Sequence, residues 1–192
     1  MDKELIKGLI AEYQQFVKSV SFVKRAVTLS DNFNYVFVGL RRVGKSYLMY
    51  QQIHHLIETG ISPEEILFFN FEDERIAGMD TEHLDMIKRC YEEMYSHRPI
   101  FFLDEIQIVP HWEQFVRRLA DQKYRVYVTG SNAKMLSKDI ATTLGGRFMI
   151  QYVYPFSFRE YLSSNGVQLD KLWIYKNRSE AVSYTHLRAH ET

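Results

Sequence analysis

The stretch that most constrains the fold is "GLRRVGKS", residues 39–46, which fits the pattern G-x-x-x-x-G-K-[ST]. It leaves a short apolar run, "NYVFVGL" (34–40), and enters a helical pattern, "KSYLMYQQIHHLIETG" (45–60). A strand that turns through glycines into a helix directs successive backbone N–H groups inward, where they can cradle a phosphate. The sequence therefore predicts a phosphate-binding loop made of Gly39, Leu40, Arg41, Arg42, Val43, Gly44, Lys45, Ser46 and Tyr47.

Individual residues of this loop have expected roles. Lys45 is expected to reach the β- and γ-phosphate oxygens of a nucleotide, and the Ser46 hydroxyl to bind Mg²⁺. The alternative is a glycine-containing turn with an exposed lysine. Arg41 and Arg42 have two interpretations: they bind phosphate, another subunit or a nucleic acid, or they are solvated loop charges.

The rest of the chain alternates short apolar runs with helical patterns. Near-continuous apolar strands separated by helices are typical of a parallel sheet covered on both faces. The sequence thus predicts an α/β fold. Strands are expected over 34–40, 65–72, 99–105, 124–131 and 147–154. Helices are expected over 1–27, 45–60 (closed by Gly60), 81–96, 111–122 and 132–140.

A second motif, "IFFLDEIQ" (100–107), places two acids after a buried strand. Ligands of parallel sheets bind beyond the carboxyl ends of the strands. Asp104 is therefore expected to hold Mg²⁺, and Glu105 to orient and deprotonate an attacking water. The alternatives are a helix cap for Asp104 and a solvated surface carboxylate for Glu105.

A third strand, in "VYVTGSN" (126–132), also ends in small polar residues. Ser131 and Asn132, with Thr129 behind them, are candidates to hydrogen-bond the γ-phosphate or the attacking water. The competing interpretation is ordinary turn chemistry, with Asn132 capping the next helix.

Arg147 follows two glycines at the start of the last strand, in "LGGRFMIQYVYPFSFREYL" (144–162). An arginine there could reach the γ-phosphate of its own or a neighbouring subunit, and such a finger can raise a rate by roughly 10³–10⁵. A structural salt bridge is nearly as well supported.

Three remaining features are expected to be structural. The acidic segment "NFEDER" (70–75) is interpreted as a solvated strand end, with the alternative that Glu72 or Asp73 faces the nucleotide. His54 and His55 have no third metal ligand nearby, so both are expected to be structural histidines. Cys90 lies in a helical pattern, which favours a buried structural thiol over a nucleophile.

Composition limits the choice of partners. Lys+Arg and Asp+Glu balance at 24 each, so overall charge gives no support for DNA binding or for an anionic membrane. A single cysteine fits a reducing compartment, and no apolar stretch approaches the roughly 20 residues that span a bilayer. The expected location is the cytoplasm.

With these motifs, the sequence resembles the bacterial and archaeal AAA-type ATPases in which an AAA_14 domain precedes a DUF4143 domain. The resemblance covers about residues 1–175. The resemblance implies a three-layer P-loop fold of the ASCE/AAA type, with a mainly parallel five-stranded sheet of order 5-1-4-3-2. It also implies ATP and Mg²⁺ as ligands, Walker A and Walker B roles for the first two motifs, and an "L-x-GR" element at 144–147.

The expected organisation has four parts. Residues 1–27 form a helical segment on an ATPase core, 28–162 the P-loop domain, and 163–181 the start of a C-terminal region. Residues 182–192, "VSYTHLRAHET", match the translation of a sequencing-library adapter and are expected to be an artefact at the end of a truncated chain.

The function predicted from these features is hydrolysis of ATP to ADP and phosphate, with Mg²⁺ bound and a water activated by Glu105. The alternative is a nucleotide-gated switch or scaffold with little turnover. It would control a C-terminal winged-helix/DUF4143 module. Its possible partners would include another copy of the chain and DNA.

Overall fold

Five parallel strands form one sheet in the order β2-β3-β4-β1-β5. The computed structural model describes residues 2–131 and 142–166. The strands are β1 (Asn34–Val38), β2 (Ile66–Asn70), β3 (Ile100–Asp104), β4 (Val126–Gly130) and β5 (Phe148–Tyr152). The predicted order, 5-1-4-3-2, is the same order counted from the other edge, and is confirmed.

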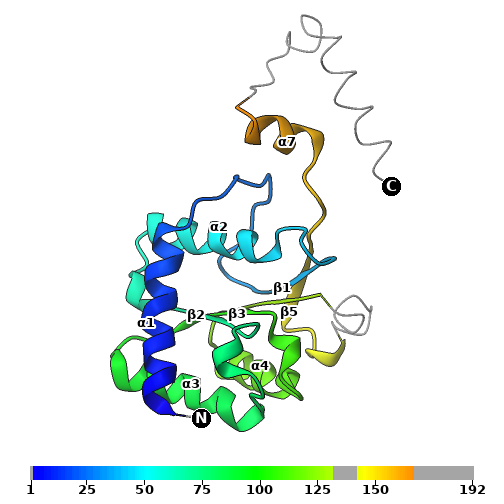
Figure 1. Cartoon of the computed structure of the whole chain (residues 1–192). Helices are drawn as coiled ribbons and strands as arrows, with labels where there is room; N and C mark the ends of the chain where they lie inside the picture. Colours follow the sequence, from blue (N-terminus) through cyan, green and yellow to red (C-terminus); the bar gives the residue numbers. More distant parts are fainter. Residues whose placement is uncertain (1, 132–141, 167–192) are drawn as a thin grey trace, which may run out of the picture. The chain divides into compact units, whose positions relative to one another are not determined.

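Helices cover both faces of the sheet. They are α1 (Lys3–Ser19), α2 (Lys45–Glu58), α3 (Thr81–Met94) and α4 (Trp112–Asp121), with 3₁₀ turns η1 (Pro63–Glu65), η2 (Glu74–Ile76) and η3 (Ile106–Ile108). In Figure 1, α2 lies on one side of the strands, and α3 and α4 lie on the other. α1 packs against the edge strand β2 and against α3. The result is the three-layer α/β arrangement expected from the sequence.

Burial explains why the central strands are apolar throughout. All five residues of β3 and all five of β4 are buried. On one face, Tyr127 stacks at 4.5 Å on Phe102 and at 5.9 Å on Tyr35, which are its register partners on β3 and β1. Aromatic cross-strand pairs of this kind hold neighbouring strands in register.

The N-terminal helix is shorter than the sequence predicted. The expectation of helix through residue 27 is wrong beyond Ser19, since Val20 is already extended (φ −67°, ψ 128°). The Ser19 hydroxyl donates to the Phe16 carbonyl at 3.1 Å, and the sequence that follows, "VSFV", has poor helix formers. Local hydrogen bonding and β-branched residues therefore end the helix early.

The end of α2 agrees with the prediction of a glycine cap. Gly60 has φ +105°, and its N–H donates to the Ile57 carbonyl at 3.1 Å. The Ile61 N–H reaches back to the Leu56 carbonyl at 3.0 Å. This double hydrogen-bonding pattern is a Schellman motif, which needs a left-handed residue where Gly60 stands.

The chain divides by its contacts into two units, Met1–Phe22 with Val27–Pro155 and Val23–Ala26 with Phe156–Thr192. The second unit contains the short helix α7 (Phe158–Ser164), whose Glu160 accepts from Arg25 at 2.8 Å. Over residues 2–131 and 142–166, no helix is long and apolar enough to cross a membrane.

Candidate functional site

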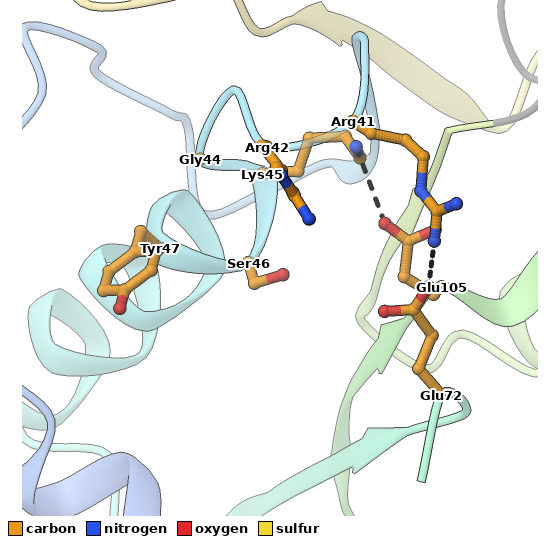
Figure 2. Close-up of a pocket in the computed structure, with 8 residues that line it drawn as sticks. All are labelled: Arg41, Arg42, Gly44, Lys45, Ser46, Tyr47, Glu72 and Glu105. Atoms are coloured by element: carbon orange, nitrogen blue, oxygen red, sulfur yellow. Dashed lines mark hydrogen bonds and ion pairs between the residues drawn. The ribbon is translucent and has the colours of Figure 1, made fainter.

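The parallel register brings the carboxyl ends of the central strands to one edge of the sheet. Asn70 pairs with Asp104, and Val38 pairs with Gly130. A cavity of about 800 Å³ opens at this edge (Figure 2). Its lining residues come from the loop after β1, the start of α2 and the ends of β2 and β3: Arg41, Arg42, Gly44, Lys45, Ser46, Tyr47, Glu72 and Glu105.

Backbone crowding explains the first glycine of the loop motif. A Cβ atom on Gly39 would lie 2.4 Å from the Val153 carbonyl oxygen, and the Val153 N–H donates to the Val38 carbonyl at 2.7 Å. Gly44 has φ +94° at the N-cap of α2, a backbone conformation that L side chains rarely adopt. The motif glycines thus let the loop turn tightly against β5 and into the helix.

Lys45 is the buried cation of the cavity. Only 4% of the residue is exposed, and its Nζ donates to the Gly39 and Leu40 carbonyl oxygens at 3.3 and 3.0 Å. The same Nζ lies 3.5 Å from Glu105 Oε1, and a dashed line marks this contact in Figure 2. The ammonium group is therefore held inside the loop and directed at the carboxylate of the second motif.

Asp104 is held at the end of β3 by hydroxyl donors. Thr129, on β4, donates to Asp104 Oδ1 at 2.5 Å and accepts from the Glu105 N–H at 2.8 Å. Burial raises the pKa of Asp104 to about 6; the Thr129 and Ser46 hydroxyls oppose the shift, the Glu105 carboxylate adds to it and Lys45 opposes it. A bound cation would offset this burial penalty.

Glu105 lies just past the strand in a left-handed conformation, φ +53°. Its Oε2 accepts from the Ser131 hydroxyl at 3.0 Å and from Gln107 Nε2 at 2.5 Å. Ser131 was a sequence candidate, and the structure brings it to Glu105. Gln107 was not foreseen, because no spacing rule singles out a glutamine in a short 3₁₀ turn.

The two acids that follow β2, Glu72 and Asp73, point in different directions. Glu72 lines the cavity and pairs with Arg41 at 3.0 Å, and both side chains are substantially exposed. Asp73 turns toward α1, where it accepts from Tyr13 at 2.6 Å and from Arg75. Arg75 lowers the pKa of Asp73, chiefly by hydrogen bonding. Of the two acids considered, Glu72 is the one that faces the cavity.

Other loop residues differ in their relation to the cavity. Tyr47 is half-exposed and, in Figure 2, points away from Lys45 and Glu105. The Leu40 side chain is exposed, and it contributes to the loop through its carbonyl oxygen. Asn132 lies outside the described residues.

Arg147 is not brought together with these residues. It precedes β5, so it lies at the amino ends of the parallel strands, whereas the cavity lies at their carboxyl ends. Its Nε donates to Asp121 at 2.5 Å and its Nη1 to the Gly145 carbonyl at 3.2 Å. This placement fits the salt-bridge alternative, and a role toward a neighbouring subunit stays a prediction.

The residues available for a metal ion favour a hard cation. Ser46 and Asp104 offer oxygen ligands, which suit Mg²⁺, and nucleotide phosphates usually complete its coordination. The described residues contain no cluster of three or more His, Cys, Asp or Glu side chains that could hold a metal by themselves. His54 instead contacts the Val17 carbonyl at 2.8 Å, and its ring packs on Phe22.

Comparisons with known proteins agree with this geometry. Residues 31–162 match a family model, AAA_14, described as an AAA domain. The chain is 31% identical over 184 residues to an uncharacterized protein of Methanocaldococcus jannaschii, with 95% of this chain and 40% of that protein covered. It is 34% identical over 168 residues to an uncharacterized protein of Haemophilus influenzae, covering 85% and 42%.

Among solved structures, the fold is similar to that of the Saccharomyces cerevisiae Hsp104–ADP complex. The TM-score is 0.52 at 15% identity, with 86% of this chain and 26% of that chain covered. At this identity the likeness concerns the fold alone. The chain spans about two fifths of the length of the two curated relatives above.

Proposed function

The chain belongs to the AAA_14 family of AAA domains, and we propose that this nucleotide-binding domain hydrolyses ATP to ADP and phosphate. The observation that carries the proposal is the meeting of Lys45 and Glu105 at one cavity, with Asp104 directly beside them. A buried cation, a buried acid and a carboxylate at the carboxyl edge of a parallel sheet suit phosphate binding and water activation.

Binding would depend on the loop and the start of α2. The backbone N–H groups after Gly39, together with the N-terminus of α2, would cradle the phosphates. Lys45 would exchange its carbonyl contacts for the β- and γ-phosphate oxygens. Ser46 and Asp104 would hold Mg²⁺, which supplies positive charge next to the phosphate oxygens.

Glu105 would activate the attacking water. Its carboxylate takes one proton from the water, the water oxygen forms a bond to the γ-phosphorus, and the bond to the β-phosphate oxygen breaks. ADP leaves with the bonding electron pair. Because the loop amides are fixed by the fold, they stabilise the developing charge without reorganising, and Lys45 adds its positive charge once it has turned to the phosphates.

The second candidate is a nucleotide-gated switch with little turnover. It is favoured by the contacts of Glu105, whose two carboxylate oxygens are both occupied by Lys45, Ser131 and Gln107. In this version, ATP would control a module outside the described residues, such as the DUF4143 region. The greater length of the relatives supports considering such a module.

Steady-state phosphate release distinguishes the two candidates. Under hydrolysis, the wild-type protein should release phosphate from ATP in a Mg²⁺-dependent way, and Lys45→Ala should remove that release. Under the switch, ATP should bind while release stays at background. Phosphate release that is the same in wild type and in Lys45→Ala would contradict the proposed hydrolysis, since it could not come from this site.

A further inference from the structure

The two carboxylate oxygens of Glu105 have different surroundings. Oε2 accepts two hydrogen bonds, from Gln107 Nε2 at 2.5 Å and from the Ser131 hydroxyl at 3.0 Å. Oε1 has the Lys45 ammonium at 3.5 Å. One oxygen is therefore bound to neutral donors of the fold, and the other faces a cation that belongs to the phosphate-binding loop.

The orientation of the Gln107 amide follows from this contact. An ionised carboxylate only accepts hydrogen bonds, so the amide must turn its NH₂ group toward Glu105 Oε2. The amide oxygen then points elsewhere. Over residues 2–131 and 142–166, Gln107 Oε1 is the buried side-chain oxygen or nitrogen without a hydrogen-bond partner.

A buried acceptor without a partner destabilises a folded chain, and an apolar side chain of similar size would avoid that cost. Gln107 thus stabilises the fold less than an apolar side chain of similar size would. Its amide instead donates a hydrogen bond to Glu105. Departures from good packing chemistry of this kind concentrate at functional sites.

The backbone holds both partners in place. Glu105 is fixed at φ +53°, and its N–H donates to Thr129. The turn that contains Gln107 is held by its neighbour Ile106. The Ile106 side chain is fully buried, and the Ile106 carbonyl accepts from the Val109 N–H at 3.0 Å. With the backbone fixed, the contacts of Oε2 set the direction of the carboxylate.

From these contacts we propose that Gln107 is a positioning residue for hydrolysis. Together with Ser131 it anchors Oε2, so that Oε1 is the oxygen that takes the proton from the attacking water. The inference rests on the proposed hydrolysis. When Lys45 turns to the phosphates, Oε1 loses its cationic neighbour and becomes available, while Oε2 keeps both donors.

The test compares two substitutions. Gln107→Met keeps a similar size without polar atoms and removes the donor, and Gln107→Glu keeps the shape but places a second carboxyl group beside Glu105. Gln114→Met, on the exposed surface of α4, is the matched control. Three quantities are measured for each variant: the dissociation constant for ATP, the single-turnover rate of hydrolysis, and the thermal midpoint.

We expect both Gln107 variants to lower the single-turnover rate by roughly 10- to 100-fold, because a base misplaced by about 1 Å loses on this scale. The ATP affinity of the neutral Gln107→Met variant should change by less than about twofold, since Gln107 does not line the cavity. Gln107→Met should unfold at the same or a higher temperature than wild type, because the unpaired buried acceptor is gone.

Each outcome assigns the failure to one claim. If wild type hydrolyses ATP and a folded Gln107→Met variant does so equally fast, the positioning role is wrong and the proposed function stands. If Gln107→Met loses rate only in proportion to lost stability or lost ATP affinity, the residue is structural. If wild type shows no Mg²⁺-dependent turnover at all, the proposed function itself fails.

Discussion

Two ion pairs, one inside the cavity at the carboxyl edge of the sheet and one at the amino edge, differ in burial. At the carboxyl edge, the side chains of Lys45 and Glu105 are 3% and 11% exposed. At the amino edge, those of Arg147 and Asp121 are 38% and 53% exposed. Exposed pairs contribute little and need no ligand, whereas buried charges are costly unless something compensates them. The contrast favours the carboxyl edge as the binding site that we propose for a charged ligand.

Two glycines, one at each edge, have different surroundings. At Gly39 an added Cβ would meet the Val153 carbonyl oxygen, whereas at Gly146, near the start of β5, it would meet nothing within 4 Å. Backbone atoms thus crowd Gly39 and leave space at Gly146.

Loss of the buried cation should have the largest effect. Lys45→Ala should weaken ATP binding by roughly 100-fold or more, because a charge-assisted hydrogen bond to the phosphates is lost. Isothermal titration calorimetry with ATP measures this directly. Arg147→Ala is the control from the other edge, and its ATP affinity should equal that of wild type. An equal loss of ATP affinity in Lys45→Ala and Arg147→Ala would contradict the placement of the ATP site at the carboxyl edge.

Crowding at the carboxyl edge should appear as lost stability. Gly39→Ala should lower the free energy of unfolding by about 2–3 kcal/mol, because the new methyl group displaces the Val153 backbone. Gly146→Ala meets no neighbour and should lose about 1 kcal/mol, from its backbone conformation at φ +66°. Urea denaturation measures both, and a Gly39→Ala loss no larger than that of Gly146→Ala would contradict the crowding argument.

The buried acid should make stability depend on pH. The pKa of Asp104 is about 6 in the folded chain, raised from 3.8 by burial. Between these values the folded chain binds more protons than the unfolded chain, so stability falls as the pH rises from about 4 to 6. The penalty is complete above pH 6 and is on the order of 2–3 kcal/mol.

Asp104→Asn should remove this dependence. Without nucleotide or Mg²⁺, the variant should gain stability relative to wild type by roughly 2 kcal/mol between pH 4 and pH 7.5, in denaturant titrations at each pH. Asp121→Asn is the matched control, since its ion pair is exposed. A stability difference for Asp104→Asn that does not grow with pH would show that the buried charge carries no such cost.

The smallest effect is expected at the amino edge. Arg147→Ala should change the free energy of unfolding by less than about 1 kcal/mol, since exposed ion pairs are screened by solvent. Chemical denaturation of the isolated chain measures this. A loss comparable to that of Gly39→Ala would mean that the Arg147–Asp121 pair is a main support of the fold.

The meeting of Lys45, Asp104 and Glu105 at one end of the sheet could be predicted because their positions depend on where the strands end. Their roles toward a nucleotide stay predictions. Asp104 ends the buried strand β3 and Glu105 follows it, while Lys45 begins α2 after the loop that leaves β1, and parallel strands bring such positions together. The same rule indicates the opposite edge for Arg147, which precedes its strand. The interpretation in which Arg147 reaches the γ-phosphate of its own subunit overlooked this placement at the amino ends of the strands.

Two other features could not be read from sequence patterns. Gln107 meets Glu105 through side-chain directions in a 3₁₀ turn that follows a left-handed residue, and no periodicity encodes those directions. The end of α1 at Ser19 depends on a local hydroxyl bond and on β-branched neighbours, which compete with a helical pattern of apolar residues. Local geometry decided both.

Glu105 is the proposed base for the attacking water, and single-turnover hydrolysis of bound ATP by Glu105→Gln with Mg²⁺ tests this role. The side chain keeps its shape and loses its basicity, so hydrolysis should slow by roughly 100-fold or more while the dissociation constant for ATP stays within a few-fold of wild type. Hydrolysis by Glu105→Gln at the wild-type rate, with ATP bound equally well, would contradict the account.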